Sequence, residues 1–106
     1  METQTAVTLL AGLAHPTRLE VFRLLVRAGD EGLPAGELAR HLDLPPPTLS
    51  FHLKELRTAG LVAAHRRGRH VVYQVEFTAI RTLVAFLTEE CCAGLEPSTC
   101  TSEEAR

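Results

Sequence analysis

The sequence between residues 46 and 62 reads PPTLSFHLKELRTAGLV, and it decides the fold. Leu49, Leu53 and Leu56 recur at intervals of four and three residues, which places them on one face of a helix. Prolines precede this helix, and Gly60 follows it where a left-handed residue often ends a helix. The opposite face carries small polar groups, one aromatic ring and cations: Thr48, Ser50, Phe51, Lys54 and Arg57. Such a helix can enter a DNA major groove, although an ordinary amphipathic surface helix has the same pattern.

Apolar periodicity around this stretch predicts a mainly α-helical chain with one β-hairpin, in the order α-α-α-α-β-β-α. Stripes of apolar residues predict helices over residues 4–13, 15–28 and 34–42. His15-Pro16-Thr17 indicates the entry of the second helix, with proline in its first turn. The short third helix, a tight connection and the longer fourth helix have the spacing of a helix-turn-helix, whose second helix reads the groove.

Residues 61–75 change to a period of two, which predicts two short strands joined by a turn. The turn reads Arg66-Arg67-Gly68-Arg69-His70. A hairpin that directly follows a helix-turn-helix is a wing, and a tip with three arginines suits phosphates or a minor groove. The alternative is a hairpin tip that meets only solvent, and the adjacent candidate reading helix disfavours it.

The charge of the chain is unevenly distributed. The whole chain has a formal net charge of −2, which at first argues against a nucleic-acid partner. Residues 44–70, however, carry five cations against one carboxylate, a net of +4. Residues 76–106 carry two cations against six carboxylates, a net of −4. Salt limits the reach of a charge to about 10 Å, so the local basic region matters more for a polyanion than the total does.

A long apolar stripe predicts a last helix over residues 77–92. The stripe consists of Ile80, Leu83, Val84, Leu87 and Cys91. Together with the first helix it is more apolar than a small monomer needs, so we expect a homodimer through the first and last helices. Two reading helices would then lie about one DNA turn apart. We predict a winged helix-turn-helix domain over residues 1–92 and a flexible acidic tail over 93–106 that carries Cys100.

The composition excludes several other classes of protein. A chain of 106 residues suits one small domain, and no apolar run approaches the roughly 20 residues of a membrane span. No signal peptide is recognisable, so we expect a cytoplasmic protein with reduced thiols and no membrane partner. An enzyme is not expected, because the sequence has no glycine-rich phosphate loop and no candidate base near its cysteines.

Several segments together resemble the ArsR/SmtB family of winged helix-turn-helix repressors from bacteria and archaea. These segments are His15-Pro16-Thr17-Arg18-Leu19, Leu38-Ala39, residues 49–56 (LSFHLKEL), residues 59–62 (AGLV), Arg67-Gly68-Arg69 and Val72-Tyr73. The resemblance covers nearly the whole chain. It implies a homodimer that binds double-stranded operator DNA without inducer and leaves it when a metal or metalloid binds.

The resemblance also implies that DNA is contacted by the helix after Pro45 and by the wing. The positions that we expect there are Pro47, Thr48, Ser50, Phe51, His52, Lys54, Arg57, Arg66, Arg67 and Arg69. We expect the residues up to Lys54 to read bases or to fix the helix, and the arginines to hold phosphates. For His52 two roles stay open, because it could contact a phosphate or support the helix.

The sensing site departs from the best-known members of this family. Metalloid sensors often carry a Cys-x-Cys pair in the third helix, and zinc sensors often carry histidines on the last helix; this sequence has neither. Its only cysteines are Cys91, Cys92 and Cys100. Thiolates select soft ions, and three of them without a nearby histidine fit trigonal arsenite or antimonite, whereas zinc would need a fourth ligand.

The spacing of the cysteines sets a condition on this site. Neighbours on an ideal helix diverge by about 100°, so Cys91 and Cys92 can hold one ion only if the last turn loosens before Gly94. Cys100 then reaches back across a short loop, which costs little entropy. The resemblance adds that some arsenic-responsive members keep an adjacent cysteine pair at this place. We therefore expect As(III) as the inducer with three thiolate ligands and no catalytic cofactor.

Other interpretations of the cysteines stay open. Cys91 continues an apolar stripe, and a buried cysteine is often only a small hydrophobic residue. An adjacent thiol pair with a third cysteine could also form a redox or persulfide switch. A zinc or cadmium sensor with a ligand from the other subunit is a third possibility. A cytosolic thiol protein that buffers metalloid and has no operator belongs to a different class, and the arginines of the predicted wing argue against it.

Overall fold

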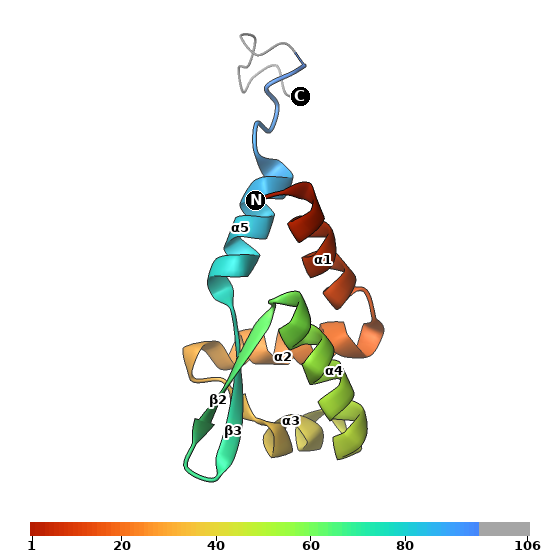
Figure 1. The fold of residues 1–106 in the computed structure, drawn as a ribbon, viewed down its shortest axis with the longest axis vertical. Helices are drawn as coiled ribbons and strands as arrows, with labels where there is room; N and C mark the ends of the chain where they lie inside the picture. The colour runs from red at the N-terminus through yellow and green to blue at the C-terminus, as the bar shows by residue number, and fades with distance from the viewer. Residues whose placement is uncertain (96–106) are drawn as a thin grey trace.

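The computed structural model describes residues 1–95 and contains the predicted succession of helices with a hairpin. The elements are α1 (Thr3–Leu13), α2 (Pro16–Ala28), the short 3-10 helix η1 (Gly29–Glu31), β1 (Leu33–Pro34), α3 (Ala35–Leu42), α4 (Pro46–Ala59), β2 (Val62–Arg67), β3 (His70–Val75) and α5 (Phe77–Thr88). Figure 1 shows α1 and α5 at one end of the molecule, α2 across the middle, and α3 with the tip of the hairpin at the other end. This arrangement confirms the predicted winged helix-turn-helix.

The hairpin is part of a three-stranded antiparallel sheet in the order β1-β3-β2. The short strand β1 was not expected from the sequence, because two residues are too few to show a period of two. It pairs Leu33 with Tyr73 and Pro34 with Val72. Gly32 has a φ of 67°, and a Cβ atom at this position would collide with the Tyr73 carbonyl oxygen. Glycine is therefore required where the chain approaches β3.

The core lies between α4 and the helices that pack on it. Leu49, Leu53 and Leu56 of α4 are at most 2% exposed, as the spacing of these leucines predicts. They pack with Leu25 of α2 and Leu38 of α3, both of which are fully buried. Burial of each such side chain stabilises the fold by about 1.5–3 kcal/mol. The buried face of α4 therefore packs in the same core as α2 and α3.

The last helix is shorter than predicted. It ends at Thr88, so the expected end at residue 92 is wrong, and Cys91 does not continue its apolar stripe. Glu89 and Glu90 follow directly, and carboxylates at a helix C-terminus are repelled by the negative end of its dipole. Glu90 and Cys92 then have positive φ values of 56° and 67°, which are incompatible with a continuing helix.

Two further expectations concern the chain ends and the membrane. Of the tail predicted over residues 93–106, only 93–95 belong to the described part, and Cys100 lies outside it. None of the helices in residues 1–95 has the length and the hydropathy that a bilayer span requires.

Candidate nucleic-acid interface and thiol pair

The exposed face of α4 carries most of the residues that the sequence assigns to DNA. Pro47, Thr48, Ser50, Phe51, Lys54 and Arg57 are all exposed. Prolines occupy the start of this helix, and Gly60 closes it in a left-handed conformation with a φ of 90°. The phenyl ring of Phe51 is 55% exposed although it is large and apolar. An apolar ring among small polar and cationic groups can contact a thymine methyl group in a major groove.

His52 differs from the other predicted contacts because it is buried. It is 6% exposed, and its ring lies against His15, with 4.7 Å between the ring centroids. Within the described residues its Nδ1 atom is buried without a hydrogen-bond partner. Burial, and then the nearby His15 and Arg18, lower the pKa of His52 from its ordinary value of 6.5. Of the two roles expected for His52, burial favours support of the helix over contact with DNA.

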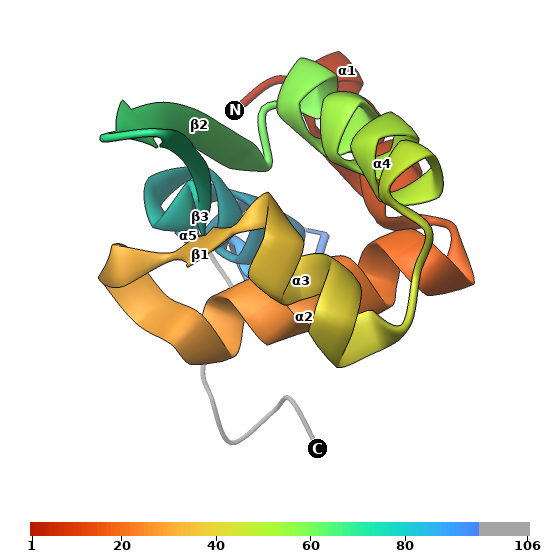
Figure 2. The same cartoon turned by 90° about the horizontal axis from the view of Figure 1, so that it is seen from below.

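The hairpin presents its arginines to solvent. Strands β2 and β3 pair from Val62 opposite Val75 to Arg67 opposite His70, and Gly68 turns the chain with a φ of 65°. Arg66, Arg67 and Arg69 are exposed. The Arg67 guanidinium lies 3.3 Å from Nε2 of His65. Seen from below, the hairpin and α4 lie on either side of α3 (Figure 2). The tip cations and the exposed face of α4 can therefore act on one polyanion.

The cysteines Cys91 and Cys92 lie beyond the end of α5, and both are exposed. Their Sγ atoms are 3.1 Å apart. Cys91 and Cys92 can hold one ion only if they are not part of a regular helix. This condition is met, because the pair lies in turns outside α5, where neighbouring side chains can point the same way. Within residues 1–95 no cluster of three or more histidine, cysteine or acidic side chains is arranged to hold a metal ion. Two expected ligands are thus together, and the third, Cys100, is not described.

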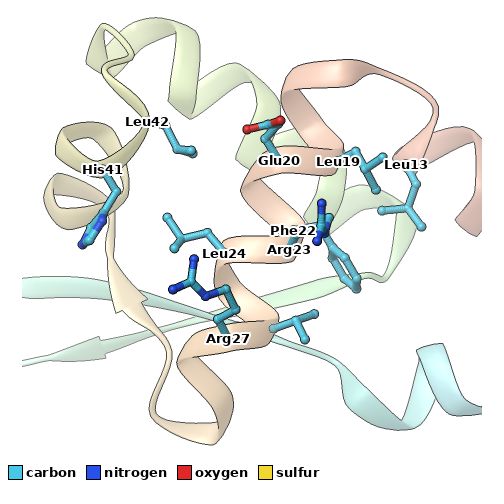
Figure 3. Close-up of a pocket in the computed structure, with 10 residues that line it drawn as sticks. Leu13, Leu19, Glu20, Phe22, Arg23, Leu24, Arg27, His41 and Leu42 are labelled. Carbon is cyan, nitrogen blue, oxygen red and sulfur yellow. The ribbon is translucent and has the colours of Figure 1, made fainter.

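An open hollow of about 530 Å³ runs along the outer face of α2 (Figure 3). Its lining combines apolar side chains with a few charged ones and histidine: Leu13, Leu19, Glu20, Phe22, Arg23, Leu24, Val26, Arg27, His41 and Leu42. No thiol and no hydroxyl nucleophile lines it. The hollow is therefore separate from the thiol pair.

A helix-turn-helix followed by an arginine-tipped hairpin defines the winged helix-turn-helix class of DNA-binding proteins. A family model described as a helix-turn-helix domain matches residues 13–64. The transcriptional regulator YgaV of Escherichia coli is 32% identical over 89 residues, which cover 84% of this chain and 88% of that protein. The chain therefore belongs to the ArsR family of transcriptional regulators. Such proteins are DNA-binding regulators and not enzymes, in agreement with the sequence.

Solved structures show the same relationship. An ArsR-like transcriptional regulator from Rhodococcus sp. RHA1 superposes with a TM-score of 0.71 at 25% identity, covering 79% of this chain and 76% of that chain. A homodimeric winged helix-turn-helix domain, Mb0332 of Mycobacterium bovis, superposes with a TM-score of 0.65 at 26% identity. That match covers 82% of this chain and 81% of the Mycobacterium chain.

Proposed function

We propose that this chain is a homodimeric cytoplasmic repressor that leaves its operator when trivalent arsenic binds Cys91, Cys92 and Cys100. The observation that carries the proposal is the 3.1 Å separation of the Cys91 and Cys92 sulfur atoms. Two thiols already side by side lose little further freedom when they bind one ion. Their exposure leaves them accessible to a small solute.

The chemistry of arsenite matches this arrangement. Arsenous acid has three hydroxyl groups, and each protein thiol replaces one of them and releases one water. Three thiols therefore yield a neutral trigonal arsenic centre and three waters, with no oxidant or reductant required. Soft thiolate ligands favour such a thiophilic centre over hard cations. Cys100 supplies the third thiol in this proposal.

Dimerisation is supported by apolar side chains that the fold leaves exposed on the outer helices. Val7 and Leu10 of α1 are 48% and 42% exposed, and Val84 and Leu87 of α5 are 55% and 56% exposed. Exposed apolar groups that gather on paired helices are typical of an interface. The related Mb0332 domain is homodimeric. A twofold axis through α1 and α5 would place two copies of α4 on successive turns of one DNA face.

The exposed residues of α4 and of the hairpin tip would contact different parts of the DNA. In this proposal Thr48, Ser50, Phe51 and Lys54 reach base edges, and Pro47 fixes the start of the helix. The four arginines bind phosphates: Arg57, Arg66, Arg67 and Arg69. Binding of arsenic next to α5 favours a dimer arrangement that spaces the two reading helices wrongly. The coupling is reciprocal, so bound operator weakens arsenite binding by the same factor.

The test is release of operator DNA by arsenite in the wild type and in a variant with Cys91, Cys92 and Cys100 replaced by serine. We expect the variant to bind the operator as tightly as the wild type and to stay bound at arsenite concentrations that release the wild type. Release from the triple variant would refute the thiol site. Failure of both proteins to bind a duplex that contains the protein's own upstream DNA would refute the operator function and favour a metalloid buffer.

A second candidate inducer is thiol oxidation or a persulfide. The proximity of the two sulfur atoms favours it as well, because adjacent thiols can be oxidised as a pair. Titrations of the protein–operator complex with arsenite, zinc, cadmium and a persulfide donor, run side by side, separate the alternatives. Release by arsenite at the lowest concentration supports arsenic sensing. Release by the persulfide donor alone, reversed by a thiol reductant, replaces it with a redox switch.

A further inference from the structure

Two histidine rings meet where the reading helix passes the start of α2. The centroids of His15 and His52 are 4.7 Å apart, and their planes are inclined by 48°. Helix α4 packs on α2, and its middle part passes the start of α2 in Figure 1. His52 is 6% exposed, and its Nδ1 atom has no partner among the described residues. Contact of α4 with DNA does not by itself explain this pair, in which His52 is buried and His15 is partly buried.

His15 has a structural task that requires its neutral form. It is the N-cap residue of α2, and its Nδ1 accepts a hydrogen bond from the backbone N–H of Thr17 at 3.1 Å. A ring nitrogen that accepts a hydrogen bond carries no proton. Protonation of His15 at Nδ1 would place an N–H group opposite the backbone N–H of Thr17, so the hydrogen bond would be lost. The helix would lose its cap, which contributes about 0.5–2 kcal/mol in typical helices.

The charged groups around His52 also oppose its protonation. Arg18 lies on the α2 side, and its Nε donates to the Gly12 carbonyl oxygen at 3.0 Å, which keeps the guanidinium in place. Glu55, one turn further along α4, acts in the opposite direction. Burial is the largest influence, and the Coulombic effects of His15 and Arg18 add to it, so together they outweigh Glu55 and lower the pKa of His52.

We propose that His15 and His52 are positioning residues, which hold α4 in its DNA-binding pose only while both rings are neutral. The inference rests on the proposed reading of DNA by the exposed face of α4. His52 is adjacent to Phe51, and their rings are in edge contact with centroids 5.4 Å apart. Movement of a protonated His52 away from His15 and Arg18 therefore shifts the neighbouring residue that faces the DNA.

If His15 and His52 act as proposed, the affinity for DNA falls as the pH falls, whereas added positive charge alone would raise the affinity. His65 and His70 lie on the hairpin next to the tip arginines, where added positive charge would strengthen phosphate binding. Loss of the neutral His15–His52 contact would instead weaken DNA binding. The pH dependence of the affinity therefore distinguishes a positioning pair from histidines that act only through their charge.

The experiment measures operator affinity by fluorescence anisotropy from about pH 8 to about pH 5.5 at constant ionic strength. The duplex is the one that the wild type selects from a random library at pH 8. We expect the wild-type affinity to fall by about tenfold on acidification, as linkage to one or two protons allows. The variant His15→Asn/His52→Gln cannot titrate at these positions, and asparagine retains a capping oxygen. Its affinity should stay constant or rise.

The control is His41→Gln, which removes an exposed histidine on α3 and should keep the wild-type pH profile. An affinity of the double variant that falls as steeply as that of the wild type would overturn the proposal. Wild-type binding at pH 8 tests the proposed function separately, since a protein that binds no operator fails there and not in the pH profile.

A second measurement uses only the wild type and does not depend on how well the variants fold. NMR spectra of the free protein follow the imidazole resonances and the α4 backbone amides during the same titration. We expect the amides of residues 48–54 to shift with the midpoint of His52. Titration of His52 without any shift of these amides would refute its positioning role, even if the affinity changes.

Discussion

The two ends of this molecule hold their functional groups in different ways. At the reading end, made of α3, α4 and the hairpin, exposed side chains stand on elements whose other faces are buried in the core. At the thiol end, made of α1, α5 and residues 89–95, Leu83 is the only buried residue of α5, and the cysteines lie in exposed turns. The difference is what we expect if the reading end recognises a rigid duplex with a preorganised surface and the thiol end gains its final structure from a partner or a ligand.

The largest effect on stability should follow from truncation of a buried side chain at the reading end. Leu53→Ala deletes a side chain that is 1% exposed, and we expect it to destabilise the fold by about 2–5 kcal/mol. The control Leu95→Ala, at a fully exposed residue of the thiol end, should stay within about 0.5 kcal/mol of the wild type. Urea unfolding followed by circular dichroism measures both. Equal stabilities of the two variants would contradict the comparison.

A smaller effect should appear where the two ends touch. A Cβ atom at Gly12 of α1 would lie 2.8 Å from both the Ala59 Cβ and the Leu61 Cδ1 atoms. Gly12→Ala should therefore cost about 1–3 kcal/mol, since the added methyl overpacks the contact of α1 with α4. Gly36→Ala is the matched control, because Gly36 is also helical and its nearest neighbour is 4.0 Å away.

The control substitution should stabilise the protein by about 0.5–1 kcal/mol through the higher helix propensity of alanine. Thermal and urea unfolding of the two variants provide the comparison. A Gly12→Ala protein as stable as Gly36→Ala would show that the contact between α1 and α4 accommodates the added methyl group.

The smallest effect should be on DNA affinity, after removal of one arginine that we expect to bind a phosphate. Arg67→Ala should weaken binding to all DNA sequences by a similar factor and lower the salt slope of the affinity by about one. The control Arg23→Ala removes an exposed cation of α2, away from the reading end, and should leave the slope unchanged. Anisotropy titrations at several salt concentrations measure both. An unchanged slope for Arg67→Ala would remove this arginine from the interface.

Much of the fold follows from local signals in the sequence. The leucines at 49, 53 and 56 mark the buried face of α4, because a helix repeats every 3.6 residues. His15-Pro16-Thr17 marks the start of α2, and the structure confirms that this helix begins at Pro16. The strand β1 and the true end of α5 were not predicted. A two-residue strand is specified by its partner, and the end of a helix is the least certain part of a periodic pattern.

The candidate functional site also has a part that follows from the sequence and a part that follows only from tertiary packing. Exposure of Thr48, Ser50, Phe51 and Lys54 follows from which face of α4 carries leucine, so this part of the candidate DNA surface can be predicted from the sequence. That His52 lies under this surface against His15 was decided only by the tertiary structure, because the two residues are 37 positions apart in the printed sequence and meet through the packing of α4 on α2. The side-by-side sulfur atoms also depended on the fold, since an early end of α5 releases them from helical geometry.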